Sequence, residues 1–276
     1  MTPSGSLSPR SSDTVPPKRI AIFAATHWEM SAVRSAFPPG VNRRIGNLPV
    51  SVCAVDDREY WLVQTGVGLE KAERNAARLL GDQSFNLMVS TGFACALIAA
   101  DIGTLLVGRE VVHRGTHSEK SMIEIFDMPG DERDLVMALI QTLVPSEHIG
   151  RFVSTDRIVG SASEKRRFAL STQAIALDME SSALAAQAQR AQVPFVIIRS
   201  VSDLLDEDLP LDFNLFLRPT GWLKGIGAVL AAPSCLLGLH RLRRQSLVAA
   251  EALTAFFRNY AEAMATGRRK KEFSQT

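Results

Sequence analysis

Short apolar runs along the chain alternate with segments in which apolar residues recur at helical spacing. The first run, RIAIFAA (19–25), is rich in apolar residues and lacks an alternating pattern, as expected of a strand covered on both faces. The next segment, WEMSAVRSAF (28–37), has helical spacing and ends at Pro38-Pro39-Gly40. Together they predict a β-turn-α unit whose strand lies near the centre of a sheet.

The same order recurs through the following 170 residues. Because strands that alternate with helices form doubly wound sheets, the pattern predicts an α/β fold. Further strands are expected at 60–66, 86–92, 104–113, 174–180 and 194–203, with helices at 69–80 and 181–192.

The two ends of the chain differ from this body. Residues 1–17 are rich in Ser and Pro and hold almost no bulky apolar side chain, which predicts a disordered leader. The alternating pattern indicates a catalytic domain over 18–215, a helical apolar and basic extension over 216–266, and a disordered tail over 267–276.

Composition narrows the class of protein. The 276 residues are 46% hydrophobic and 22% charged, which argues against a wholly disordered, collagen-like or multispanning membrane protein. The net charge of +2 points to no nucleic-acid partner, but it averages a body at −5 with a stretch from Arg218 onward at +7. We therefore expect a soluble enzyme or binding domain with a cationic end.

Cysteine and histidine positions carry little chemistry. The three cysteines, Cys53, Cys95 and Cys235, lie far apart without a CxxC pair, and the N-terminus resembles no signal peptide. The histidines show no metal-ligand spacing, so we expect reduced thiols, a cytoplasmic protein and no metal.

Polar residues follow four of the expected strands. In doubly wound sheets the carboxyl ends of the strands form the ligand crevice. The candidates are Thr26–Glu29, Ser90–Leu97, Met179-Glu180 and Ser202-Asp203. Taken singly, an acid in such a place is more often a helix cap or a first-turn residue than a catalytic group.

Taken together, these segments carry a resemblance. IAIFAATHWEM, QTGVGLEKAERNAARLL, STGFACAL, STDRIV, ALDMESSALA and VPFVIIRSVSD span residues 19 to about 208. In this order they resemble the nucleoside phosphorylase and nucleosidase superfamily, in particular its adenine-releasing methylthioadenosine/adenosylhomocysteine nucleosidases. The resemblance implies a three-layer α/β/α sandwich with a central twisted, mostly parallel mixed sheet.

The resemblance also implies roles for individual residues. Asp203 corresponds to the general acid that protonates the purine at N7, and Glu29 to the carboxylate that activates water. Met179 and Glu180 correspond to residues that hold the ribose. Supporting or base-binding roles fall to Ser202, Arg199, the backbone at Ile158 and Val159, and Phe93 with Thr91 and Gly92 of the same loop.

The reaction needs two carboxyl groups in opposite states. Breaking an N-glycosidic bond leaves positive charge on the sugar and negative charge on the base, so Asp203 must be protonated while Glu29 is ionised. Two departures from the family bear on this chemistry: a Gly-rich loop is replaced by Phe93-Ala94-Cys95-Ala96, and the Gly-Asp-Pro-x-Arg phosphate motif is absent. Hydrolysis is therefore favoured over phosphorolysis, and no cofactor is expected beyond inorganic phosphate if the enzyme is a phosphorylase.

The C-terminal segment has a second, looser resemblance. LPLDFNLFLRPTGWLKGIGAVLAAPSCLLGLHRLRRQSLVAAEALTAFF resembles the tail of hopanoid-associated phosphorylases, which remove adenine from adenosylhopane. Within it, residues 226–239 form a 14-residue apolar stretch, interrupted by Gly and Pro, that is too short to span a bilayer and precedes the basic cluster His240–Arg244. This suits a peripheral contact with the inner membrane through 222–244, and it equally suits a helix that covers the sheet or a dimer contact.

Three functions stay open. One is cleavage of a 5′-substituted adenine nucleoside such as adenosylhopane. Another is a methylthioadenosine/adenosylhomocysteine or futalosine-type nucleosidase, and the third is a non-catalytic family member that binds a nucleoside or a membrane. The superfamily resemblance further implies a homo-oligomer.

Overall fold

A mixed ten-stranded sheet forms the centre of the protein in the computed structural model, which describes residues 16–115, 121–124, 129–214 and 235–273. The strand order is β10-β6-β8-β9-β5-β1-β4-β3-β2, with β7 paired to β6. The strands are β1 (Lys18–Ala24), β2 (Val41–Ile45), β3 (Leu48–Val55), β4 (Arg58–Gln64), β5 (Leu87–Ala96), β6 (Leu105–Arg114), β7 (Ser121–Glu124), β8 (Ile149–Thr155), β9 (Ala176–Asp178) and β10 (Phe195–Asp203).

Parallel pairing brings the functional end of the sheet together. β5 runs parallel to both β1 and β10, so the carboxyl ends of these three strands lie side by side. β5 also pairs antiparallel with β9, and β10 antiparallel with β6, so β5, β10, β6, β8 and β9 close into a ring. The polar residues after β1, β5 and β10 are thereby placed at one end of the molecule.

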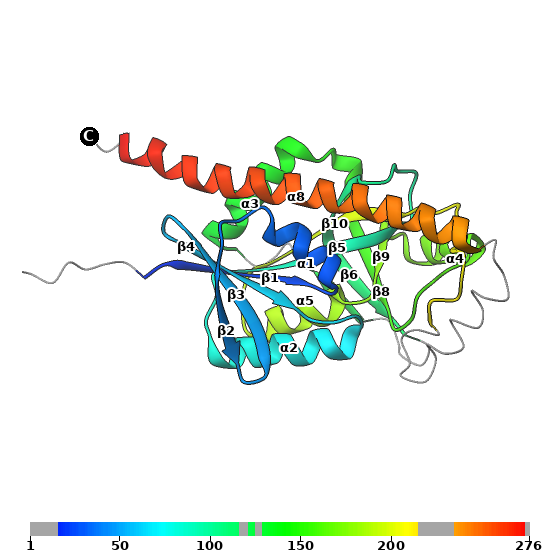
Figure 1. Cartoon of the computed structure of the whole chain (residues 1–276), viewed down its shortest axis with the longest axis horizontal. Helices are drawn as coiled ribbons and strands as arrows, with labels where there is room; N and C mark the ends of the chain where they lie inside the picture. Colours follow the sequence, from blue (N-terminus) through cyan, green and yellow to red (C-terminus); the bar gives the residue numbers. More distant parts are fainter. Residues whose placement is uncertain (1–15, 116–120, 125–128, 215–234, 274–276) are drawn as a thin grey trace, which may run out of the picture.

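Helices cover both faces of the sheet, as Figure 1 shows with α1 and α8 on one side and α2 and α5 on the other. The helices are α1 (His27–Arg34), α2 (Leu69–Asp82), α3 (Asp131–Leu143), α4 (Ala162–Thr172), α5 (Ser181–Arg190) and α8 (Cys235–Phe273), with a 3-10 turn, η1, at Ser146–His148. The predicted α/β class, with three layers and a mixed sheet, is confirmed.

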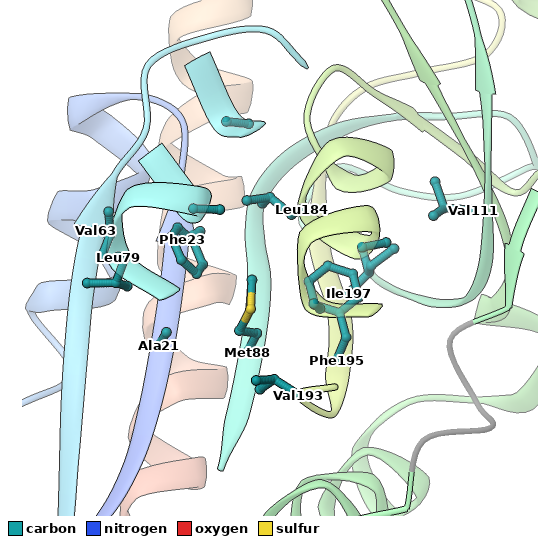
Figure 2. Close-up of a cluster of buried hydrophobic side chains, with 14 of the residues drawn as sticks. Ala21, Phe23, Val63, Leu79, Met88, Val111, Leu184, Val193, Phe195 and Ile197 are labelled. Atoms are coloured by element: carbon teal, nitrogen blue, oxygen red, sulfur yellow. The ribbon is translucent and has the colours of Figure 1, made fainter. Parts of the chain in front are cut away.

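Alternate side chains of β1 enter two separate cores. Ala21 and Phe23 face α2 and α5, in the cluster that Figure 2 shows with Met88 and Leu184. Ile20 and Ile22 face α1 and α8 on the other side of the sheet. Because both faces are covered, the strand has no polar face, which explains the uninterrupted apolar run in its sequence.

The C-terminal helix α8 is part of the core rather than an appendage. It lies along the whole body in Figure 1, and Phe256, Phe257 and Tyr260 are fully buried against the side of the sheet that Ile20 and Ile22 face. The helix continues to Phe273, and the disordered tail expected over 267–276 stays a prediction. Residues 1–15 of the predicted leader lie outside the described residues, as do residues 222–234 of the membrane contact predicted over 222–244.

Candidate active site

A cavity of about 250 Å³ opens at the carboxyl ends of β1, β5 and β10, next to the start of α5. It gathers side chains from segments that are far apart in the sequence. Its lining comprises Ala25, Thr26, Glu29, Val67, Phe93, Ala94, Cys95, Ile158, Val159, Leu177, Asp178, Met179, Glu180, Ser202 and Asp203. A larger surface groove, about 580 Å³, is lined by Arg114, Phe168 and neighbours and has none of the candidate residues on it.

Glu29 lies in the first turn of α1, and its carboxylate is fixed from two directions. Oε2 accepts hydrogen bonds from the backbone N–H of Thr26 at 2.7 Å and from its hydroxyl at 2.8 Å, which forms a capping box. Oε1 accepts the backbone N–H of Phe93 at 2.7 Å. All three partners are donors, so an ionised carboxylate satisfies each of them while still lining the cavity.

Gly92 makes this position of Glu29 sterically attainable. Its φ of +136° lies in a region that other residues rarely adopt. A Cβ built there would lie 2.3 Å from Glu29 Oε1 and 2.7 Å from Arg199 Nη1. Gly92 does not line the cavity. Its lack of a side chain lets the Glu29 carboxylate and the Arg199 guanidinium approach the backbone of β5.

Arg199 is the buried centre of the carboxylate cluster. Its guanidinium lies 3.0 Å from Asp178 Oδ2, 3.4 Å from Glu180 Oε2 and 4.0 Å from Glu29 Oε1. Burial lowers the pKa of Arg199, but the three carboxylates outweigh burial and the net direction is upward. Arg199 thus stays charged and holds three acidic side chains in one place without itself lining the cavity.

Glu180 is oriented by the first helical turn of α5 and by a distant loop. Its Oε1 accepts the backbone N–H of Gly68 at 2.9 Å, and its Oε2 faces Arg199. Burial raises the pKa of Glu180 to about 7, with Arg199 acting in the opposite direction and the charges of Asp178 and Glu29 adding to the rise. Glu180 is therefore an acceptor on the cavity wall whose charge is sensitive to pH near neutrality.

Asp178 supports this arrangement from beneath. Its Oδ1 accepts the hydroxyl of Ser154 at 2.5 Å and the backbone N–H groups of Glu180 and Ser181 at 3.3 and 3.2 Å. A carboxylate that accepts N–H groups at a helix start is a favourable cap. Asp178 therefore both begins α5 and pairs with Arg199, a role that the sequence interpretation did not assign.

Asp203 ends β10 where the pairing with β5 is irregular. The register shifts between Val201 and Asp203, and such bulges re-aim side chains next to active sites. Burial raises the pKa of Asp203, while the charge and hydrogen bond of Lys165 act in the opposite direction. Lys165 Nζ donates to Asp203 Oδ1 at 2.6 Å, a partner that the sequence did not indicate.

The remaining candidates divide between lining and support. Met179, Ser202, Val159 and Phe93 line the cavity, whereas Thr91 is fully buried and lies outside its lining. Ile158 also lines it, but Asn214 engages both its N–H at 2.7 Å and its C=O at 2.8 Å. The base contact expected of the Val159 backbone stays a prediction.

No group of three or more His, Cys, Asp or Glu side chains suited to a metal ion occurs in residues 16–115, 121–124, 129–214 and 235–273. Over the same ranges, no helix combines the length and apolar character needed to cross a membrane.

Known proteins resemble this chain in sequence and in fold. The sequence profile of the Phosphorylase superfamily matches residues 19–218. The 5′-methylthioadenosine/S-adenosylhomocysteine nucleosidase of Staphylococcus aureus (strain bovine RF122 / ET3-1) is 23% identical over 210 residues, which cover 72% of this chain and 92% of that protein.

Two solved structures from Helicobacter pylori share the fold. Its 5′-methylthioadenosine/S-adenosylhomocysteine nucleosidase superposes with a TM-score of 0.63 at 17% identity, covering 87% of this chain and 97% of that one. Its futalosine hydrolase superposes with a TM-score of 0.67 at 15% identity, covering 91% and 98%.

Proposed function

Because the chain belongs to the phosphorylase superfamily, we propose that it is a nucleosidase, which adds water across the N-glycosidic bond of a 5′-substituted adenine nucleoside and releases adenine. The observation that carries the proposal is one cavity in which two of the four lining carboxyl groups, Glu29 and Asp203, have unlike surroundings. Glu29 is surrounded by hydrogen-bond donors, whereas burial favours the protonated form of Asp203. The nucleosidase relatives support the same reaction class.

The proposed reaction uses these groups as base and acid. As the bond between C1′ and N9 breaks, its electron pair moves onto the purine, and Asp203 passes a proton to N7 so that neutral adenine leaves. A water molecule attacks C1′ and gives its proton to Glu29. Acid and base on opposite sides of the scissile bond follow the logic of inverting glycosidases.

Glu180 and Met179 complete the proposed substrate site. Glu180 accepts a ribose hydroxyl from a position held by Gly68 and Arg199, and Met179 packs on the sugar. Because the ring flattens as positive charge develops, hydrogen bonds to a fixed acceptor strengthen in the transition state.

Hydrolysis is favoured over phosphorolysis by the charges around the cavity. Arg199 and Lys165 are buried beside the cavity without lining it, and both already face carboxylates. Arg199 faces three and Lys165 faces Asp203. A phosphate ion would have to displace one of these partners, whereas a water molecule needs only an acceptor such as Glu29.

Product analysis tests this proposal. Purified protein should release adenine and free 5-methylthioribose from methylthioadenosine at the same rate with and without inorganic phosphate. Release that requires phosphate and yields the sugar 1-phosphate would make the enzyme a phosphorylase. Failure to release adenine from any 5′-substituted adenosine would favour the non-catalytic alternative.

We propose further that the 5′ substituent is large and apolar, as in adenosylhopane. At about 250 Å³ the cavity is small beside common ligand sites of 300–1,000 Å³, so a bulky 5′ group would extend outside it. Trp28, next to Glu29 in α1, is 67% exposed, and Leu237 near the start of α8 is 80% exposed. A groove of about 300 Å³ between Ile102 and α8 adds apolar surface beside Arg241 and Arg244.

The same surface supports peripheral contact with anionic lipid. Arg243 and Arg244 are exposed next to Leu247 and Val248, a mixture of cationic and apolar side chains that suits a lipid interface. Cosedimentation with phosphatidylglycerol vesicles, but not phosphatidylcholine vesicles, should weaken in the variant Arg243→Glu/Arg244→Glu. Arg258→Glu, on an exposed part of α8 further along the helix, is the matched control.

Soluble nucleosides are the alternative substrates. The relatives and neighbours named above act on methylthioadenosine, adenosylhomocysteine or futalosine by their names. Values of kcat/KM for these compounds should be compared with that for adenosylhopane in vesicles. A much higher kcat/KM for a soluble compound would contradict the proposal of a lipid substrate. It would still agree with the proposed nucleosidase activity.

A further inference from the structure

The ammonium group of Lys165 is completely buried beside the proposed general acid. Lys165 lies in the first turns of α4, and its side chain is 0% exposed. Nζ donates to Asp203 Oδ1 at 2.6 Å, to the carbonyl of Leu204 at 2.9 Å and to the carbonyl of Glu207 at 2.7 Å. Three acceptors match the three hydrogens of an ammonium group, so the charged form is fully satisfied.

The residues that surround Lys165 are themselves held in place by hydrogen bonds to the start of α4. Residues 204–209, here called the acidic strap, follow Asp203 and fold back over the start of α4. Asp208 Oδ1 accepts the N–H of Ala162 at 2.7 Å, and Leu209 N–H donates to the Gly160 carbonyl at 2.8 Å. Lys165 therefore joins the acidic strap to the carboxylate that lines the cavity.

We propose that Lys165 is a positioning residue for the proposed reaction: it holds one carboxylate oxygen of Asp203 so that the other faces the purine, and it stabilises the carboxylate left after proton transfer. This inference rests on the proposed function. Removing a buried charge partner from an acid changes both its geometry and its proton affinity, so the role differs from a purely structural one.

The proton inventory follows from this pairing. Although burial favours the protonated form, the proposal requires that Asp203 in the free enzyme is ionised and paired with Lys165. A purine whose N7 is an acceptor must therefore bring one proton from solvent to Asp203 as it binds. That proton goes to N7 when the C1′–N9 bond breaks, Asp203 returns to the carboxylate facing Lys165, and the proton from water leaves by way of Glu29.

Other ionisable groups face Asp203 as well. Cys95 of β5 forms a hydrogen bond to it, and Glu207 of the acidic strap adds a negative charge that raises its pKa. The thiol of Cys95 itself has a pKa raised well above the ordinary value, first by burial and then by the charge of Asp203, so it stays neutral. Lys165 is thus the cation that acts on Asp203 among these neighbours.

The variant Lys165→Met tests the proposal through the pH profile of kcat/KM for adenine release. Above the optimum, kcat/KM falls as pH rises. Loss of the cation should shift this falling limb to higher pH by about 1 to 3 pH units. The kcat at the optimum should fall by about 10- to 100-fold, with KM little changed, because positioning is lost while the sugar-binding residues remain. Lys165→Arg should restore the wild-type limb.

Arg166→Met is the matched control. Arg166 is the next residue on α4, is largely exposed, and pairs with Asp206 of the same acidic strap without facing Asp203. It should keep both the limb and kcat. If Lys165→Met still releases adenine and its falling limb stays at the wild-type pH, the role proposed for Lys165 is contradicted. The proposed nucleosidase activity is then unaffected.

A titration of the wild-type enzyme decides the point even if Lys165→Met does not fold. Calorimetry in buffers of different ionisation enthalpy should detect uptake of about one proton on binding a carbocyclic 5′-methylthioadenosine, whose N7 is an acceptor. A 9-deazaadenine analogue, whose N7 carries hydrogen, should bind without uptake. If neither analogue causes proton uptake, Asp203 is already protonated beside Lys165, and the proposal is contradicted. A wild-type enzyme that releases no adenine would contradict the proposed function instead.

Discussion

The carboxylate of Glu29 caps α1 and also lines the cavity. Replacement by Gln removes the charge and leaves one oxygen for donors that now occupy two. We expect Glu29→Gln to lower kcat for hydrolysis by about 100-fold or more, and to lower the free energy of unfolding by about 1 to 3 kcal/mol. Steady-state kinetics well below the melting temperature measure the first effect. Glu70→Gln, an exposed first-turn acid of α2, should change neither, and equal losses in both variants would refute the assignment.

Glu180 should make the stability of the protein depend on pH. Its pKa of about 7 in the folded state lies above the ordinary 4.5, chiefly because of burial. The folded state therefore holds this proton more tightly than the unfolded state, so the stabilisation is complete below pH 4.5 and is lost as pH rises towards 7.

Glu180→Gln should abolish that loss. Urea unfolding at pH 5 and pH 8 should find the variant more stable than the wild type at pH 8, by on the order of 2 kcal/mol, with a smaller difference at pH 5. Asp203, whose pKa is also raised, keeps some pH dependence in the variant. A variant less stable than the wild type at pH 8 would show that the ionised Glu180 stabilises the fold.

Gly92→Ala should disrupt the site through sterics alone. The added methyl group would overlap Glu29 and Arg199 at a positive φ. We expect a lower melting temperature and loss of activity, whereas Gly81→Ala, in α2 with open space around it, should be neutral or stabilising. Thermal unfolding and adenine release measure both, and an active, stable Gly92→Ala protein would contradict this geometry.

Sequence motifs pointed to Glu29, Glu180, Asp203 and Arg199 but not to Asp178 or Lys165, which pair with Arg199 and Asp203. Asp178 looked like the end of a strand, and its double role depends on Arg199 arriving from β10. Lys165 stands in the run Glu164-Lys165-Arg166-Arg167, which is typical of a solvated helix face. Which of three successive cations is buried depends on the acidic strap that covers α4, and no local pattern contains that information.

At the scale of elements, α8 contacts two segments near the cavity, the acidic strap and α1. Gln245 donates to Glu207 of the acidic strap at 2.9 Å, and further along Thr254 donates to the carbonyl of Ala32 in α1 at 3.0 Å. Helix α8 therefore supports both the segment after Asp203 and the helix that carries Glu29.

The buried part of α8 should be essential for folding. Phe257→Ala removes a fully buried ring that contacts Phe37 and Tyr260, and should cost about 3 to 5 kcal/mol. Arg258→Ala, the exposed neighbour, should cost less than about 0.5 kcal/mol. Chemical denaturation of both variants measures the difference, and similar small losses would mean that α8 is an appendage after all.

The elements that the pattern predicted best are the ones buried on both faces. The strands at β1, β4, β5 and β10 were predicted to within a few residues because their apolar runs are uninterrupted. β2, with the polar sequence VNRRI, was missed because it lies exposed at the sheet edge, where pairing with β3 alone defines it. The long α8 was only partly predicted, since an apolar and basic segment fits an interfacial helix as well as a core helix.

At the scale of the whole molecule, the chain joins an acidic cavity to a cationic, partly apolar surface. The carboxylates gather around Arg199 at the ends of the strands, and the arginines of α8 lie on the outside of the same end. This division explains why the total charge of +2 says little about function. Under the proposed function, the cavity takes the base and the surface beside α8 takes the 5′ substituent.

The central claim is that Asp203 protonates the leaving base. Its most direct test is the rate of adenine release by Asp203→Asn, measured beside the binding of a 9-deazaadenine nucleoside analogue. We predict that the variant still binds the analogue but releases adenine at least about 1,000-fold more slowly than the wild type. Adenine release by Asp203→Asn at a rate near that of the wild type would contradict the account.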